Sequence, residues 1–298
     1  MNSRTRPGGP ADSALVADAE HRDEASNSEF LALKPALAAQ GFSSALVAWD
    51  DPAVDWSSFR LCVIRATWDY HLRLPEFLAW AERIAAQMAL WNPLDLVRWN
   101  THKSYLRDLE AQGVAIVPTV WAPRGTNLDL AALMSDRGWT RAVIKPAISA
   151  SAYATNLVTS ETIAEGQAHL DALLAERDMM IQPFLASVTT TGERSLVYFD
   201  GILSHTILRS PALGEDTDEK ARLIPNDAEE ATFADRVMQA VSGETLYARV
   251  DIARDDAGNL RLMELELVEP WLGLELAPDA AVRFAAAIAR RMETRQSP

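Results

Sequence analysis

Charged side chains with the spacing of a binding site gather in residues 247–270, near the C-terminus. Two short runs rich in apolar and β-branched residues flank a turn cluster, Asp-Asp-Ala-Gly-Asn at 255–259. This pattern predicts a β-hairpin. If residues 256–259 form the loop, Arg254 pairs with Arg261, and the rest of the register follows from that pair.

The predicted register places Asp251 opposite Glu264 and Arg249 opposite Glu266, all on one face of the hairpin. The other face receives apolar side chains, namely Val250, Ile252, Met263, Leu265 and Leu267. Carboxylates directly across a ladder repel each other unless a positive charge lies between them. A cation would remove that repulsion, and an oxygen-only ligand set favours Mg²⁺ over zinc or copper. A solvated acidic face on an ordinary antiparallel sheet explains the hairpin alone equally well.

A second charged group, Lys145, projects from the apolar run 141–146, and the small residues of 147–155 follow it. A lysine in a buried strand is costly unless an anion compensates it. Small side chains let backbone N–H groups approach an anion, and Ser149 and Ser151 add hydroxyl donors. The segment indicates a phosphate site, although a lysine that protects an edge strand from aggregation explains Lys145 equally well. Only four of the 28 basic residues are lysines, and Lys103 is another of them.

Several other chemistries lack sequence support. The chain contains neither G-x-x-x-x-G-K-[ST] nor G-x-G-x-x-G, so the P-loop and the dinucleotide-binding fingerprint are absent. It has no G-x-S-x-G elbow, and its five histidines lack the spacing of zinc ligands. Cys62 is the only cysteine, so a disulfide framework is excluded and a reducing cytoplasm is expected.

The bulk properties predict a globular protein of two or three domains. The chain has 298 residues, of which 48% are hydrophobic and 23% charged, and no apolar run reaches transmembrane length, so no membrane association is expected. A net charge of −14 argues against nucleic-acid binding, which requires a basic surface. Residues 1–12 lack an apolar core, which predicts a disordered leader and not a targeting peptide.

The elements before residue 98 predict a parallel, doubly wound α/β unit. Strands are expected at 13–17, 44–49 and 61–65, helices at 28–40 and 75–88, and a short strand or helical turn at 94–98. Residues 65–70, Arg-Ala-Thr-Trp-Asp-Tyr, leave the third strand at its carboxyl end, where open α/β sheets bind ligands. We expect Trp68 in the core and leave the role of Asp69 open.

The remaining chain alternates strands, helices and hairpins. Helices are expected at 102–112 with an N-cap at Asn100 or Thr101, at 127–138, at about 160–176, at 229–241 and at 279–294. Strands are expected at 113–121, 141–146, 156–159 and 179–184, with a further hairpin of 194–200 and 202–208. Residues 211–225 have no period and many charges, which predicts a mobile loop.

Four of these pieces, in this order, resemble the ATP-grasp ligases: Lys103; Val-Ile-Lys-Pro at 143–146 with Ser-Ala-Ser-Ala at 149–152; Ile-Gln-Pro-Phe-Leu at 181–185; and Arg-Val-Asp at 249–251 with Glu-Leu-Glu at 264–266. Further motifs resemble a bacterial subgroup of that family. They are R-x-T-W-D-Y, W-N-T-x-K-x-Y-L, G-E-R-S-L-V-Y-F-D-G-x-x-S-H and E-L-E-x-x-E-P. The subgroup is related to glutathione synthetase and ribosomal-protein glutamyl ligases and includes the cyclo-ligase of cycloserine biosynthesis.

The resemblance implies an α/β fold of the α+β ATP-grasp type. A doubly wound pre-ATP-grasp domain at 13–97 would precede a lid subdomain at 98–185 and a catalytic subdomain at 186–298, and the last two would clasp ATP. The implied activity is ATP- and Mg²⁺-dependent ligation of a small-molecule carboxylate and an amine through an acyl phosphate. Intramolecular cyclisation in a specialised biosynthetic pathway, the identity of both substrates and a homodimer stay open.

The resemblance also implies roles for individual residues. ATP phosphates would contact Lys103, Lys145, Ser149 and Ser151, and adenine would contact Gln182, Pro183, Phe184 and Leu185. Mg²⁺ would be held by Asp251, Glu264 and Glu266, while Arg249 and Lys145 would act on the transferring phosphoryl group. Glu193 would contact nucleotide or metal, and the candidates for substrate contact are Arg65, Asp69, His205 and Arg209.

The sequence departs from the family at three places. Glu266 stands where many relatives have asparagine, the lid loop lacks the usual glycines, and Ser195 stands where several relatives have a substrate-binding arginine. Two other functions share the same nucleotide site, a non-catalytic nucleotide sensor and a phosphotransferase. A sensor has no need for three metal carboxylates, which favours the ligase.

Overall fold

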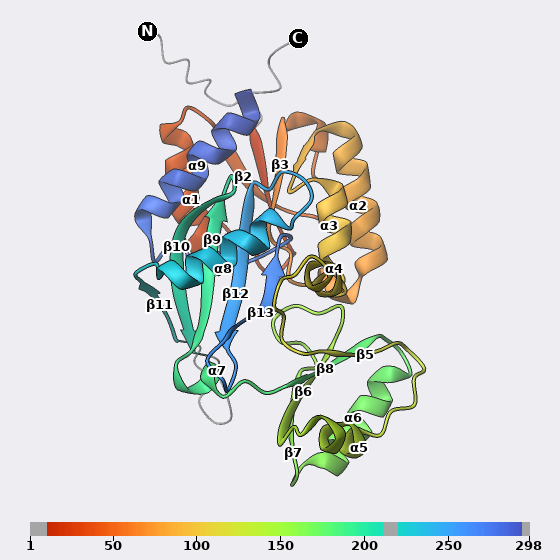
Figure 1. The fold of residues 1–298 in the computed structure, drawn as a ribbon. Helices are drawn as coiled ribbons and strands as arrows, with labels where there is room; N and C mark the ends of the chain where they lie inside the picture. Colours follow the sequence, from red (N-terminus) through yellow and green to blue (C-terminus); the bar gives the residue numbers. More distant parts are fainter. Residues whose placement is uncertain (1–10, 211–219, 294–298) are drawn as a thin grey trace.

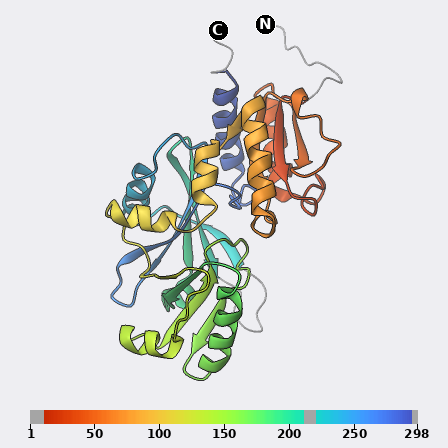
Figure 2. The ribbon, with the colours of Figure 1, turned by 90° about the vertical axis from the view of Figure 1, so that its right-hand side faces the viewer.

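The computed structural model of the chain describes residues 11–210 and 220–293. It contains three sheets (Figures 1 and 2), with the strand orders β2-β1-β3-β4, β11-β10-β9-β12-β13 and β5-β8-β6-β7. The first sheet is parallel throughout, and the other two are antiparallel. The mixed α/β class predicted from the sequence is confirmed.

The first sheet forms the doubly wound unit expected for the N-terminal region. Its elements are β1 (Ser13–Ala17), α1 (Ser28–Ala39), β2 (Ser44–Ala48), β3 (Leu61–Ala66), α2 (Leu74–Gln87), β4 (Ala89–Trp91) and two short 3₁₀ turns, η1 (Trp56–Ser58) and η2 (Tyr70–Leu72). α2 packs on one face through Phe77, Trp80 and Ile84, and α1 packs on the other through Phe30, Leu33 and Leu37. Of the predicted leader, residues 1–10 lie outside the described residues, whereas the Asp12 carboxylate accepts hydrogen bonds from Ser43.

The C-terminal helix α9 (Pro278–Glu293) joins the first sheet to the second one. Figure 1 shows α9 beside α1, and the two helices are in contact. Phe284 and Ile288 of α9 share one core with Leu33 of α1 and with Phe199 and Ile207 of the second sheet. Helices α1 and α9, which are far apart in the sequence, therefore pack together.

The second sheet carries the acidic hairpin. Its elements are β9 (Glu193–Phe199), β10 (Ile202–Ser210), β11 (Lys220–Ile224), α8 (Ala228–Gln239), β12 (Tyr247–Arg254) and β13 (Leu260–Glu266). α8 and α4 (Tyr105–Ala111) cover the apolar face of β12 and β13. α8 begins where the Asp227 carboxylate accepts the N–H groups of Glu229 and Glu230, a standard N-cap.

The third sheet forms a separate layer at the end of the molecule away from the first sheet (Figure 2). Its elements are β5 (Val120–Ala122), α5 (Leu130–Arg137), β6 (Arg141–Pro146), β7 (Asn156–Thr159), α6 (Ile163–Leu174) and β8 (Met179–Pro183). α5 and α6 cover one face, and their core includes Leu130, Leu170 and Ile144. The domain limits at 97, 185 and 298 stay a prediction.

The hairpin register is as predicted at the acidic end and shifted by one residue at the turn. Arg249 lies opposite Glu266 and Asp251 opposite Glu264, but Arg254 pairs with Leu260 and not with Arg261. A β-bulge after Asp251 absorbs the extra residue. As a result Met263 leaves the predicted apolar face and packs against Ala253, while Leu262, buried at 0% exposure, takes its place in the core.

Residues 94–98, predicted as a short strand or a helical turn, are helical and belong to α3 (Leu94–Asn100). Other local predictions were wrong. Asn100 ends α3 and does not cap the next helix, α4, which begins at Tyr105. Of the strand predicted at 113–121, only Val120 and Trp121 are strand residues; the preceding part makes one isolated bridge, from Ile116 to Leu262. Part of the predicted loop at 211–225 is the edge strand β11, and residues 211–219 lie outside the described residues. A short helix, α7 (Ser187–Thr190), was not predicted.

Candidate active site

Three carboxylates converge on the polar face of the β12–β13 hairpin. Asp251, Glu264 and Glu266 each offer an oxygen, and these oxygens lie within 4.8 Å of one another. An all-oxygen set at this spacing fits a hard cation such as Mg²⁺. The structure therefore brings together the three residues predicted to hold the metal.

Arg249 lies inside this carboxylate group and is only 5% exposed. Its Nε and Nη2 donate to the Asp251 carboxylate at 2.8–3.1 Å, and Nη2 also donates to Glu266. Nη1 donates to the carbonyl of Trp271 at 3.0 Å. Burial raises the pKa of Glu266 and Arg249 partly opposes that shift. The additional negative charge at Glu266 is thus compensated by an arginine that the protein itself provides.

Two lysines from elsewhere in the chain contact the third carboxylate, Glu264. Lys103 Nζ lies 3.0 Å and Lys145 Nζ 3.4 Å from the Glu264 Oε1 atom. Burial raises the pKa of Glu264, but the charges of Lys103 and Lys145 outweigh it and hold the pKa well below its usual range. Both side chains are mostly buried, so an anion is needed beside them. Glu264 is the negative partner of both lysines in this structure. A phosphate that displaced the Glu264 carboxylate would therefore lie beside both of them.

The segment around Lys103 is fixed to β13 by hydrogen bonds that sequence reasoning missed. Asn100 accepts the N–H of Leu267 at 2.7 Å and donates to the carbonyl of Leu265 at 2.8 Å. The Tyr105 hydroxyl accepts the N–H of Leu265 at 3.0 Å. β13 is an edge strand, and these side chains satisfy backbone groups that a neighbouring strand would otherwise pair. The motif W-N-T-x-K-x-Y-L therefore positions Lys103 opposite Glu264.

The small-residue loop predicted to contact phosphates follows β6. Lys103 Nζ donates to the Ser149 carbonyl at 3.0 Å, and Ser149 is 6% exposed. Ser151, Ala152 and Ala154 have φ values of 48°, 54° and 52°, a left-handed conformation that is unusual for residues other than glycine. Backbone N–H groups in such turn conformations can form a concavity that suits an anion. The loop adopts with alanine and serine a backbone conformation that favours glycine.

The predicted adenine segment lies at the end of β8, an inner strand of the third sheet. Gln182 is buried and donates to the Thr119 hydroxyl at 2.8 Å, while the Phe184 ring lies 4.3 Å from the Arg141 guanidinium. Leu185 belongs to a small apolar cluster with Val117, Val188, Ala253 and Met263. Ala253 follows Asp251 by two residues on the same strand, so this apolar cluster borders the metal carboxylates. A flat apolar ring such as adenine fits that arrangement.

The structure separates the two remaining candidates on β10. Arg209 lies 3.7 Å from Glu193 and 3.6 Å from Asp251, so it faces the carboxylate group. Burial raises the pKa of Glu193 to about 7, although Arg209 opposes the shift. His205 makes a different contact: its Nε2 lies 2.8 Å from the carbonyl oxygen of Leu272, and its contact with substrate stays a prediction. Glu193 and Arg209 are the pair that the structure adds to the hairpin.

Arg65 and Asp69, which were predicted to contact substrate, both contact other residues of the protein. Arg65 is 5% exposed, pairs with Glu29 at 2.8 Å and donates to the carbonyl of Pro270 at 2.7 Å. Asp69 accepts from the Trp49 indole at 2.9 Å and pairs with Arg73. These contacts assign both residues a structural role and argue against the sequence prediction.

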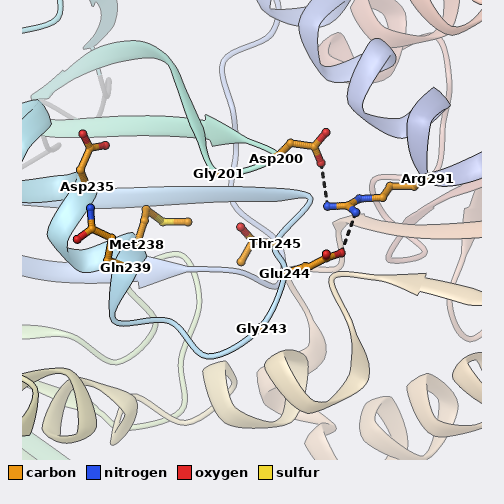
Figure 3. A pocket seen from close by; sticks show the side chains of 9 residues that line it. All are labelled: Asp200, Gly201, Asp235, Met238, Gln239, Gly243, Glu244, Thr245 and Arg291. Carbon is orange, nitrogen blue, oxygen red and sulfur yellow. Dashed lines mark hydrogen bonds and ion pairs between the residues drawn. The ribbon is translucent and has the colours of Figure 1, made fainter. Parts of the chain in front are cut away.

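A cavity of about 530 Å³ lies beside Asp200 and Thr245 (Figure 3). Figure 3 shows Arg291 between two of its carboxylates, and the guanidinium contacts Asp200 at 3.1 Å and Glu244 at 2.8 Å. Three residues of α8 also line the cavity, whereas none of the candidate-site residues does. This cavity is therefore distinct from the candidate active site.

Comparison with known proteins shows the family to which the chain belongs. Residues 13–92 match the family described as D-cycloserine synthetase DcsG, N-terminal domain. The chain is 33% identical over 275 residues to the cycloserine biosynthesis protein DcsG of Streptomyces lavendulae, a match that covers 85% of this chain and 90% of that protein. The crystal structure of D-cycloserine synthetase DcsG superposes with a TM-score of 0.85 at 30% identity and covers 94% of this chain and 99% of that one.

A more distant structure, the ATP-grasp ligase PsnB complexed with minimal precursor, Mg and ADP, superposes with a TM-score of 0.63. It is 14% identical and covers 95% of this chain and 98% of that one, so the likeness shows a shared fold. The identity over most of both chains, the N-terminal match and the three-sheet fold lead to one conclusion. The chain belongs to the ATP-grasp ligases, in the family of D-cycloserine synthetase DcsG.

Proposed function

We propose that the enzyme joins a carboxylate to an amine through an acyl phosphate made at the β12–β13 hairpin. Its class follows from the family: it is an ATP-dependent carboxylate–amine ligase that forms a C–N bond. The observation that supports the site is the joint arrangement of Asp251, Glu264 and Glu266 with the cations of Lys103, Lys145 and Arg249. In the proposed reaction the substrate carboxylate attacks the γ-phosphorus and ADP leaves. The amine then attacks the acyl carbon and phosphate leaves.

In the proposed reaction the acidic residues would bind the metal and the basic residues would bind the phosphates. Asp251, Glu264 and Glu266 would hold Mg²⁺, which supplies positive charge to the phosphate oxygens. Lys103 and Lys145 would exchange the Glu264 carboxylate for phosphate oxygens, because both are buried and require a negative partner. Arg249, held by two carboxylates in a fixed orientation, would stabilise negative charge on the phosphoryl group during transfer.

The apolar cluster at Leu185 and Met263 would receive adenine, and the loop with Ser149 and Ser151 would cover the phosphates. The related PsnB complex, which has the same fold, contains ADP and Mg. In residues 11–210 and 220–293 no helix is long and apolar enough to cross a membrane. We propose small molecules as the carboxylate and amine partners and a cytoplasmic location. A homodimer stays open.

A test of this function needs a control for the fold. ADP release would be measured with a panel of carboxylic acids and amino acids, with and without hydroxylamine, which traps an acyl phosphate as a hydroxamate. Asp251→Asn should lower turnover at least about a hundredfold, since it removes the negative charge that both the metal and Arg249 require at this position. Asp256→Asn, an exposed residue of the hairpin turn, is the matched control and should leave turnover unchanged. A fully active Asp251→Asn enzyme would exclude the proposed site.

A sensor and a phosphotransferase predict other results. A sensor binds the nucleotide but releases no ADP with any substrate. A phosphotransferase releases ADP but gives no hydroxamate, because a phosphate ester does not react with hydroxylamine. Only the ligase gives both ADP and a hydroxamate in the absence of the natural amine.

A further inference from the structure

One buried carboxylate near the site has no partner among the residues that the structure describes. In residues 11–210 and 220–293, the carboxylate residues that are less than 9% exposed are Asp18, Glu230, Asp251 and Glu269. Asp18 accepts from His21, Glu230 pairs with Arg194, and Asp251 pairs with Arg249. Glu269 is 7% exposed, yet in this part of the chain no hydrogen bond or basic side chain within 4.0 Å satisfies its carboxylate. A buried acidic group without a partner is costly, so its retention calls for a ligand.

The backbone of Glu269 is held at a defined place. The Trp68 indole donates to the Glu269 carbonyl at 3.0 Å, and Arg65 donates to the carbonyl of Pro270 at 2.7 Å. Both donors belong to β3 or the turn that follows it, at the carboxyl end of the parallel sheet. Glu269 also follows the metal carboxylate Glu266 by three residues. It therefore lies where the ligand-binding edge of the first sheet meets the hairpin of the second.

The surroundings of Glu269 are acidic and contain other polar atoms without partners. Burial, and then the charge of Glu266, raises the pKa of Glu269 well above its usual range. In the same turn after β3, the Thr67 hydroxyl and the His71 Nε2 are buried without a hydrogen-bond partner. The charges of Lys103 and Arg249 oppose this shift only in part, and the Lys103 Nζ is already bound to Glu264 and to the Ser149 carbonyl. Within the described part of the chain, the Glu269 carboxylate thus has no cation in direct contact.

We propose that Glu269 binds the amino group of the amine substrate and so determines which nucleophile reaches the acyl phosphate. This assignment rests on the function proposed above, because a ligase must hold an amine beside the phosphorylated carboxylate. An ammonium group supplies the hydrogen-bond donors and the positive charge that Glu269 lacks. Arg65 and Trp68 are then positioning residues, since both donate to backbone carbonyls of residues 269 and 270.

The test compares amines with matched hydroxy compounds in the presence of Mg²⁺ and a non-hydrolysable ATP analogue. The probes are D- and L-alanine against D- and L-lactate, and D- and L-serine against D- and L-glycerate, with dissociation constants measured by calorimetry. The wild type should bind at least one amino acid more tightly than its hydroxy counterpart. Glu269→Gln should weaken that amino acid about tenfold or more and leave the hydroxy acid unchanged.

Two further variants separate this role from a structural one. Glu230→Gln changes a carboxylate of similar burial on α8, beyond the opposite face of the sheet, and should keep the preference for the amine. Glu269→Asp keeps the carboxylate and serves if Glu269→Gln does not fold; it should retain part of the preference. The proposal is overturned if the wild type binds amino and hydroxy probes equally, or binds neither. It is also overturned if the preference for the amino acid survives in Glu269→Gln. Affinity for the ATP analogue and hydroxamate formation report on the proposed function separately.

Discussion

Replacement of Glu266 by asparagine tests the most unusual feature of the metal site. Asparagine, which the sequence resemblance leads us to expect at this position, keeps a side-chain oxygen there. The substitution removes one negative charge. In this protein the charge is shared between the site and Arg249, whose Nη2 donates to Glu266 as well as to Asp251. The substitution therefore changes the electrostatics of the site while it preserves the number of oxygen ligands.

The contacts set the expected size of the effect. Loss of a charged hydrogen-bond acceptor costs about 1.5–3 kcal/mol. Burial already raises the pKa of Glu266, which means that the folded protein disfavours its charge, so part of this cost is recovered. Arg249 retains three contacts to the Asp251 carboxylate. We expect a net loss of about 1 kcal/mol in the free energy of unfolding, which lowers the melting temperature by a few degrees.

Mg²⁺ binding should fall more than stability does. A change in a group that tunes a metal ligand typically costs about 10–100-fold in metal affinity. Because Arg249 neutralises part of the Glu266 charge, we expect the lower end, about tenfold or ~1.4 kcal/mol. The assay is an Mg²⁺ titration of ADP release at saturating ATP, checked by calorimetric Mg²⁺ binding, with Asp256→Asn as control. An unchanged half-saturating Mg²⁺ concentration in Glu266→Asn would show that Glu266 is not a metal ligand.

Two other perturbations follow from single contacts. Asn100→Ala removes two buried hydrogen bonds to Leu265 and Leu267, so we expect a loss of about 2–3 kcal/mol in chemical denaturation and weaker nucleotide binding as Lys103 loses its support. Burial lowers the pKa of His205, so the unfolded chain binds a proton that the folded protein does not; stability should be constant above about pH 6.5 and fall as pH decreases below it. His205→Gln should lack that part of the decline in denaturant titrations between pH 7.5 and 5.5, and an identical pH profile would contradict this explanation.

The acidic hairpin could be predicted from the sequence because a hairpin depends on residues that are close together in the chain. Alternation on β12 and β13 fixes which side chains share a face, and the turn residues place the hairpin within one position. The bulge after Asp251 was not predictable in this way, since it depends on the packing of Leu262 and Met263 against different clusters. The register was correct at Arg249 and Asp251 only because the bulge compensates for the shifted turn.

Contacts between segments that are far apart in the chain could not be predicted from a single sequence. The motif around Lys103 was recognised, but the hydrogen bonds of Asn100 and Tyr105 to β13 join residues more than 150 positions apart. Likewise, nothing local distinguishes His205 from Arg209 on β10; the register against β9 turns only Arg209 toward Glu193. Arg65 was expected to face a ligand because it ends a parallel strand, and the opposing Glu29 and Pro270 explain why it does not.

The hairpin is held from two sides by residues of quite different segments, and this explains its charge pattern. The segment of Asn100 and Tyr105 fixes the outer edge of β13 and delivers Lys103 to Glu264, while Trp68 at the end of β3 fixes the strand exit at Glu269. Backbone hydrogen bonds therefore carry the positioning, and the charged side chains remain available for ligands. Each of the three carboxylates predicted to hold the metal has a cation of the protein beside it, whereas Glu269 has none in direct contact among residues 11–210 and 220–293. That difference separates a site prepared for phosphate and metal from a neighbouring position prepared for a cationic substrate.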